Sequence, residues 1–240
     1  GYDLSAIITI KQPDSQKILV LCHGLLASKQ SLAYISSLLE FNTCRFDFGG
    51  NGESGGEWTY GGYEREVSDV RAVVGHLRSE GWEIAAILGH SKGAAAVLQY
   101  AEHYDGDVPF IFNLAGRFDT KQTPRARFSE EQWGQLEGEG AFTWSVRGCS
   151  YRVTKQAFAE RAALDMVRTS KAIQRSAVHT IHGTNDEIIP VEDAHKFAKL
   201  IADHSLDIVE GGSHSFATPP EKEHVVAAIS RRLGLTSSAS

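Results

Sequence analysis

The sequence has little cysteine, with three residues in a chain of 240. An odd count this low cannot build a disulfide scaffold. Cys22 and Cys44 are expected at opposite ends of two parallel strands, beyond the ~7 Å limit for bridging. No Cys-x-x-Cys pair is present, so a zinc site built on cysteine is not expected. This usage is typical of a reducing compartment, and we therefore expect a cytoplasmic protein.

Long hydrophobic runs and an excess of positive charge are also missing. No apolar stretch reaches the ~18 residues that a spanning helix needs, so stable membrane insertion is not expected. The chain carries 24 basic and 30 acidic residues, a formal net charge of −6, which argues against nucleic acid as a partner. The composition, with 42% hydrophobic and 22% charged residues, is that of an ordinary globular protein, and one large domain is expected.

Short buried-strand runs alternate with segments of helical period along most of the chain. This alternation predicts an α/β fold with a mostly parallel central sheet, flanked by helices through right-handed crossovers. The expected strands are 6–10, 17–22, 44–48, 84–88, 109–114, 178–181 and 206–209, and the expected helices are 28–39, 63–79, 93–103 and 191–202.

The connection between the strands at 109–114 and 178–181 is much longer than the roughly dozen residues that a crossover requires. Within it, Ser129 opens a capping-box pattern that predicts a helix, and 142–146 with 151–154 predict a hairpin around a turn at 147–150. Because the segment is rich in aromatic residues, we expect a small cap over the site. The expected division is a core of 1–116 and 171–236, a cap of 117–170 and a flexible tail of 237–240, with Trp133, Phe142 and Trp144 of the cap contacting substrate.

The strongest chemical signal is Gly89-His-Ser91-Lys-Gly93, which follows an expected strand and precedes an expected helix. This context is typical of a nucleophile elbow, in which a sharp turn exposes the serine at the carboxyl edge of the sheet. Glycines flank the serine because side chains there would strike neighbouring backbone.

A serine needs a base, and later strand ends supply one. Asp186 and His214 each follow a strand that should end at the same edge as Ser91. His214 is the expected base and Asp186 the expected acid that holds its tautomer. Asp119, which follows an earlier strand, is the alternative acid; Glu187, His90 and His182 are expected to have no catalytic role.

Cys22-His-Gly-Leu25 follows another strand end. Gly24 allows the backbone to turn so that the Leu25 N–H faces the developing oxyanion, and the Lys92 N–H is the expected second donor. His23 is expected to brace this loop. The Gly-rich stretch at 45–54 lacks GxGxxG spacing, so we do not expect a dinucleotide site.

These motifs together resemble the α/β-hydrolase superfamily, and in particular its small serine esterase-like branch of feruloyl (cinnamoyl) esterase-like and serine aminopeptidase-like proteins. The matching segments are 22–24, 46–54, 89–93, 182–194 and 209–214. The resemblance implies a triad of Ser91, Asp186 and His214, with oxyanion donors at Leu25 and Lys92. The chain departs from the pattern at Ala94, where a second glycine is common, and in its first strand, which is absent or truncated relative to the usual eight because 6–10 better matches the second.

The resulting expectation is a serine hydrolase that cleaves small or aryl/hydroxycinnamoyl carboxylic esters through an acyl-enzyme, without metal or cofactor, as a monomer or homodimer. Aminopeptidase, monoacylglycerol lipase and thioesterase activities remain open on the same triad. An aminopeptidase would need an anionic anchor for the substrate ammonium, for which Glu137 and Glu139 are candidates. A ligand-binding protein without catalysis is the alternative from another class.

Overall fold

The structure is a computed structural model that describes residues 1–121, 123, 125–146 and 148–235. Its centre is a seven-stranded sheet of order β1-β3-β2-β4-β5-β8-β9, in which β1 is antiparallel to β3 and every other pair is parallel. The expected mostly parallel sheet flanked by helices is confirmed. The strands are β1 (Ala6–Thr9), β2 (Lys17–Cys22), β3 (Thr43–Phe46), β4 (Glu83–His90), β5 (Phe110–Leu114), β8 (Ala177–Gly183) and β9 (His204–Val209).

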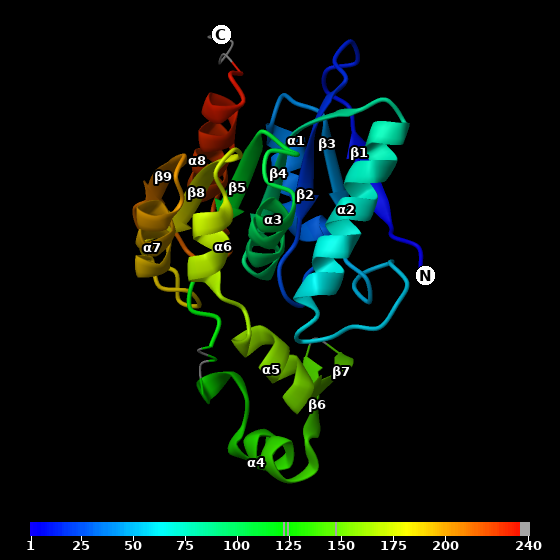
Figure 1. Cartoon of the computed structure of the whole chain (residues 1–240), viewed down its shortest axis with the longest axis vertical. Helices are drawn as coiled ribbons and strands as arrows, with labels where there is room; N and C mark the ends of the chain where they lie inside the picture. Colours follow the sequence, from blue (N-terminus) through cyan, green and yellow to red (C-terminus); the bar gives the residue numbers. More distant parts are fainter. Residues whose placement is uncertain (122, 124, 147, 236–240) are drawn as a thin grey trace.

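Helices cover both faces of this sheet, and its central strands are therefore buried along almost their whole length. One apolar core lies between the sheet and α2, α3, α6 and α7, and the other lies between the sheet and α1 and α8 (Figure 1). The helices are α1 (Ala33–Leu38), α2 (Tyr63–Ser79), α3 (Lys92–His103), α6 (Met166–Ala172), α7 (Glu192–Leu200) and α8 (Pro219–Arg232).

Three local features differ from the sequence expectation. The helix expected at 28–39 is a 3-10 turn, η1 (Lys29–Leu32), followed by the short α1. Helix α8 was not expected, although Thr218 and Glu221 form a capping box before it. Cys44 pairs with Val20, so it lies two register positions from Cys22 and not at the opposite end of the strands, and the cysteines are free.

The long connection after β5 forms a separate group of elements beyond one end of the strands of the central sheet (Figure 1). It contains a hairpin of β6 and β7 as expected, in which Val146 pairs with Cys149; Arg147, which the sequence predicts in the turn, lies outside the described residues. Its aromatic core is centred on Phe128, whose ring lies 4.9 Å from Phe142 and 5.0 Å from Trp144 between centroids. The elements are η2 (Arg125–Arg127), α4 (Glu130–Glu139), β6 (Ala141–Val146), β7 (Cys149–Thr154) and α5 (Lys155–Ala162).

The expected boundary between cap and core at 170–171 falls inside α6. Met166 is 2% exposed and packs in the core formed by α2, α3 and α7. We therefore propose that the inserted segment runs from 117 to 165. The expected tail at 237–240 lies outside the described residues.

Among the described residues, no helix combines the length and the apolar character needed to cross a membrane.

Candidate active site

Ser91 lies in the tight turn between β4 and α3, where φ is 56° and ψ is −113°. A positive φ is strained for a residue other than glycine, at a cost of about 1–3 kcal/mol, and it persists only where surrounding packing holds it. Two glycines make that packing possible. A Cβ at Gly89 would strike the backbone of Gly93, and a Cβ at Gly93 would strike the carbonyl oxygen of His23. The turn therefore presents the Ser91 hydroxyl at the carboxyl edge of the sheet.

The loops after β8 and β9 bring Asp186 and His214 to this hydroxyl. The Ser91 Oγ lies 3.0 Å from His214 Nε2, and His214 Nδ1 lies 2.7 Å from Asp186 Oδ2. These distances fit a hydrogen bond from Ser91 to Nε2 and a second bond from Nδ1 to the carboxylate. A glycine again permits the close approach, since a Cβ at Gly183 would overlap the backbone of Gly212 in the opposite loop.

The Asp186 carboxylate is fully buried and surrounded by donors. Its Oδ1 accepts the N–H groups of Ile188 at 2.8 Å and Ile189 at 2.7 Å, while its Oδ2 lies 3.2 Å from His182 Nε2 in addition to His214. Burial opposes ionisation, but the hydrogen bonds from His182 and His214 outweigh it, so the pKa of Asp186 falls well below its usual value. The side chain is therefore a fixed anion over the working pH range.

The alternative acid lies elsewhere. Asp119 Oδ1 accepts the N–H of Lys121 at 3.2 Å, and the structure shows no contact between Asp119 and His214 among the residues it describes. Glu187 contacts the backbone of His214: its Oε2 accepts the His214 backbone N–H at 3.3 Å. His182 was expected to be a structural hydrogen-bonding residue, and its Nε2 also lies 3.0 Å from the Ile189 carbonyl.

Gly24 places the loop after β2 directly against the nucleophile, because a Cβ there would lie 3.1 Å from that of Ser91. The next residue, Leu25, lines the same cavity as Ser91 and Lys92. The Lys92 N–H is in the first turn of α3, where helical N–H groups have no acceptor within the helix. His23 braces the loop: its Nδ1 donates to the Gly24 carbonyl at 2.8 Å, and its Nε2 accepts from the Phe48 N–H at 3.1 Å.

Two neighbours of Ser91 have contacts that the sequence did not indicate. His90 was expected to point into the fold, but it lines the cavity and its Nε2 donates to the His214 carbonyl at 2.9 Å. Burial, together with the neighbouring His214, lowers the pKa of His90 to about 4, so it is neutral near pH 7. The Lys92 ammonium forms a buried ion pair with Glu66 at 2.5 Å, which compensates its charge.

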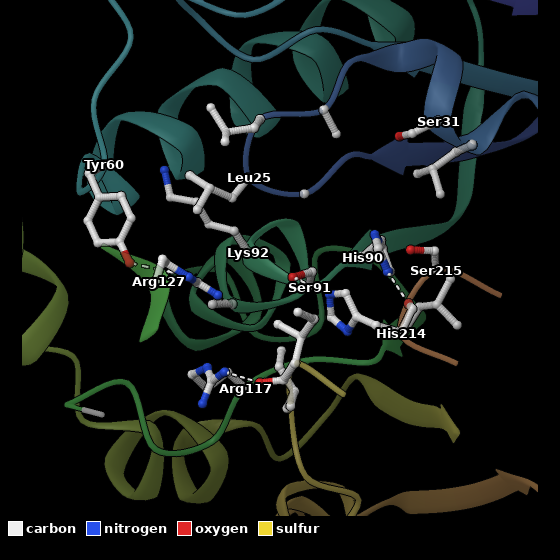
Figure 2. A pocket seen from close by; sticks show the side chains of 18 of the residues that line it. Leu25, Ser31, Tyr60, His90, Ser91, Lys92, Arg117, Arg127, His214 and Ser215 are labelled. Atoms are coloured by element: carbon white, nitrogen blue, oxygen red, sulfur yellow. Dashed lines mark hydrogen bonds between the residues drawn. The ribbon is translucent and has the colours of Figure 1, made fainter. Parts of the chain in front are cut away.

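A cavity of about 400 Å³ opens above Ser91 and His214 (Figure 2). Of the three cap aromatics expected at the substrate, Trp144 lines it. Trp133 and Phe142 are not among its lining residues and pack around Phe128 instead. The candidate anchors Glu137 and Glu139 also lie outside the lining, which contains one carboxylate, Glu187, within the described part of the chain.

Groups of three or more His, Cys, Asp and Glu side chains arranged to hold a metal ion are absent from the described ranges of the chain.

Comparisons with known proteins agree with this architecture. The sequence model of the family described as serine aminopeptidase, S33, matches residues 13–146. Ferulic-acid-bound Est1E from Butyrivibrio proteoclasticus is similar in structure, with a TM-score of 0.81 and 18% identity over 97% of this chain and 95% of that chain. A monoacylglycerol lipase from Paleococcus ferrophilus has a TM-score of 0.75 and 18% identity, covering 96% of this chain and 98% of that chain.

An esterase from Exiguobacterium antarcticum has a TM-score of 0.73 and 18% identity, covering 98% of this chain and 96% of that chain. No curated protein sequence matches the chain. The solved structures are too distant in sequence to establish more than the fold, but the family match covers more than half of the chain. The chain therefore belongs to the serine aminopeptidase S33 family of α/β-hydrolases and is a hydrolase.

Proposed function

We propose that the protein hydrolyses carboxylic esters through an acyl-enzyme on Ser91. The observation that carries the proposal is the continuous hydrogen-bonded series from Asp186 through His214 to Ser91, with distances of 2.7 and 3.0 Å, at the floor of the cavity. This order and spacing are what a serine nucleophile needs from its base and orienting acid.

In the proposed reaction, Ser91 Oγ attacks the ester carbonyl while His214 Nε2 takes its proton. The N–H groups of Leu25 and Lys92 hold the oxyanion, and Asp186 stabilises the imidazolium. His214 then protonates the leaving alcohol, and a water molecule repeats the sequence to release the acid. His90 and His182 act as positioning residues, through the His214 carbonyl and the Asp186 carboxylate respectively.

The lining of the cavity supports an ester over an aminoacyl substrate. An aminopeptidase must neutralise a substrate ammonium, yet the one lining carboxylate among the described residues, Glu187, lies beside His214. The aromatic side chains of Tyr60 and Trp144 line the cavity and suit an aryl or hydroxycinnamoyl group. Similarity to Est1E, whose solved structure holds ferulic acid, is consistent with this choice.

The test combines covalent labelling with turnover. Wild-type protein should react with a fluorophosphonate probe and hydrolyse p-nitrophenyl or hydroxycinnamate esters faster than aminoacyl anilides. Ser91→Ala should do neither, while Ser31→Ala is the matched control, since Ser31 also lines the cavity but its hydroxyl donates to the Ser28 carbonyl. Labelling of Ser91 without turnover of any ester would support a ligand-binding protein instead.

A further inference from the structure

Three arginine side chains line the cavity that holds Ser91, and each belongs to the inserted segment. Arg117 follows β5, Arg127 ends η2, and Arg161 lies near the end of α5. In Figure 2, Arg117 and Arg127 lie on one side of Ser91, together with Tyr60, while Ser31 and Ser215 lie on the other side. One wall of the cavity is therefore cationic. Arg117 Nη2 donates to the Ile188 carbonyl at 2.5 Å, Arg127 Nη1 to the Tyr60 hydroxyl at 3.1 Å, and Arg161 Nη1 to the Tyr63 hydroxyl at 3.0 Å, among its contacts.

The charges of Arg117 and Arg127 have little internal compensation. Within the described residues, neither Arg117 nor Arg127 forms an ion pair with a carboxylate. The carboxylate whose charge acts on Arg117 is that of Asp193, which is already engaged by Lys196 Nζ at 2.8 Å and by the Phe118 N–H at 2.9 Å. A neutral carbonyl or a tyrosine hydroxyl fills one of the five N–H donors of a guanidinium but does not neutralise it.

Arg161 and Arg127 also lie close enough to Arg117 to repel its charge. Burial, followed by repulsion from Arg161 and Arg127, lowers the pKa of Arg117 below the usual arginine value. Arg161 is 7% exposed, so water screens its charge only weakly. A folded protein gains nothing from holding like charges in this way, whereas an anionic ligand between them would relieve the repulsion.

We propose that the physiological ester carries a free carboxylate, and that Arg117, Arg127 and Arg161 bind it against the inserted segment while Ser91 attacks the ester carbonyl. Guanidinium groups suit this role because their planar donors match a carboxylate in bidentate geometry. Trp144 and Tyr60 also line the cavity, with ring centroids 6.3 Å apart, and Tyr60 accepts a hydrogen bond from Arg127, so these rings would cover the apolar part of the molecule. The inference rests on the proposed ester hydrolase function and specifies its substrate class.

The competing explanation is that the arginines only brace the inserted segment through Tyr60, Tyr63 and the Ile188 carbonyl. The two explanations differ in what a substitution does to neutral substrates. A lost brace slows every ester to a similar degree, whereas a lost carboxylate site slows only esters that carry the charge.

Matched ester pairs separate these outcomes. The first pair is 4-nitrophenyl hexanoate and 4-nitrophenyl hydrogen adipate, which differ in the charge at the end of the acyl chain. The second pair is phenyl butyrate and 4-carboxyphenyl butyrate, which places the charge on the leaving group. We expect the wild type to prefer the charged member of at least one pair by roughly tenfold or more in kcat/KM, and this preference should weaken as salt is added.

Arg127→Gln is the first variant, because Arg127 is half-buried and lies at the edge of the cavity. It should lower kcat/KM for the preferred charged ester by about tenfold and leave its neutral partner within about twofold. Arg125→Gln is the matched control, since Arg125 lies in the same turn but pairs with Glu130 on the surface. Arg117→Gln is a second variant in case the first fails to fold.

Preference for the neutral ester in both pairs would overturn the inference, as would a uniform loss across both members in Arg127→Gln and Arg117→Gln. If neutral esters are hydrolysed in a way that depends on Ser91 but neither charged ester is preferred, the carboxylate inference is wrong and the proposed ester hydrolase function stands. If no ester is hydrolysed, calorimetry with benzoate and benzamide decides: benzoate binding that Arg127→Gln abolishes supports the carboxylate site, and equal or absent binding rejects it.

Discussion

Asp186→Asn tests the proposed catalytic series most directly, because it preserves the shape of the side chain and replaces one acceptor oxygen with an NH₂ donor. The amide oxygen can still accept the N–H groups of Ile188 and Ile189, as Oδ1 of the aspartate does. The amide nitrogen then faces His214 Nδ1 and His182 Nε2, which both donate to the wild-type carboxylate. His214 can keep a bond only by moving its proton from Nδ1 to Nε2, where it faces Ser91 and can no longer accept the serine proton.

The expected loss in kcat is on the order of 10²–10⁴-fold, or about 3–5 kcal/mol of transition-state stabilisation. The assay is hydrolysis of a p-nitrophenyl ester at saturating substrate. Asp119→Asn is the matched control, because Asp119 contacts the Lys121 N–H and should leave the rate within about twofold. A rate for Asp186→Asn within about threefold of the wild type, or a larger loss for Asp119→Asn, would refute the assignment of the acid.

A pH series adds a second readout for Asp186. Because its pKa is lower in the folded chain than the ordinary 3.8, the ionised carboxylate stabilises the fold above about pH 4, and this contribution declines as pH falls toward the lowered value. The wild type should therefore lose stability relative to Asp186→Asn as the pH falls below about 4. A difference in unfolding free energy that stays constant from pH 7 to pH 3 would contradict the hydrogen-bond account of this carboxylate.

The remaining predictions concern Ser91, the tryptophans Trp133 and Trp144, and Glu221, which accepts the N–H of Ser213 beside His214. Ser91→Ala should fold normally and lower ester hydrolysis by about 10³–10⁶-fold, and a variant that keeps a tenth of the rate would remove Ser91 from the mechanism. Trp144→Ala should reduce kcat/KM for bulky aryl esters by about 5–30-fold more than for acetyl esters, because Trp144 lines the cavity. Trp133→Ala should slow both kinds of ester equally, because Trp133 packs in the aromatic core without lining the cavity, and the reverse pattern would contradict this assignment. Glu221→Gln should lower Tm at pH 7 by roughly 2–8 °C, because the pKa of Glu221 falls to about 2: burial opposes this, but the Ser213 and Thr218 N–H groups outweigh it. That advantage should fade between pH 4.5 and about 2, and thermal melts showing no pH dependence there would count against it.

The sequence identified the parts of the fold that local rules control. Continuous apolar runs predicted the central strands, and the small residues around Ser91 predicted the tight turn between β4 and α3. The same reasoning placed Asp186 and His214 at strand ends on one sheet edge, and the structure brings them within hydrogen-bond distance of each other. Their catalytic roles remain predictions. Helix α8 could have been predicted, since its capping box at Thr218 and Glu221 is a local signal.

The contacts of the inserted segment could not be read in this way, because they depend on how it packs over the core. Phe142 and Trp144 are two residues apart on β6, so they share one face of the hairpin and both reach Phe128. Periodicity cannot tell which of the two lies over the cavity. The cluster of Arg117, Arg127 and Arg161 was missed for the same reason, since its members come from three separate elements of that segment.

Backbone strain marks the site in a way that the sequence does not. Among the described residues, the non-glycine residues with positive φ are Leu26, Ser91, Ala115 and Phe216. Three of these line the cavity, and Ala115 follows β5, one strand along from Ser91. Glycine would adopt these conformations freely, yet a larger side chain occupies each position at about 1–3 kcal/mol of strain. Contacts with neighbouring residues must offset that cost. At Ala115, one such contact is the hydrogen bond from its N–H to the Ile181 carbonyl at 2.9 Å. Strain gathered at one edge of an otherwise regular sheet is the pattern expected where loop geometry has been fixed for chemistry, and it supports locating the function at Ser91 without reference to any motif.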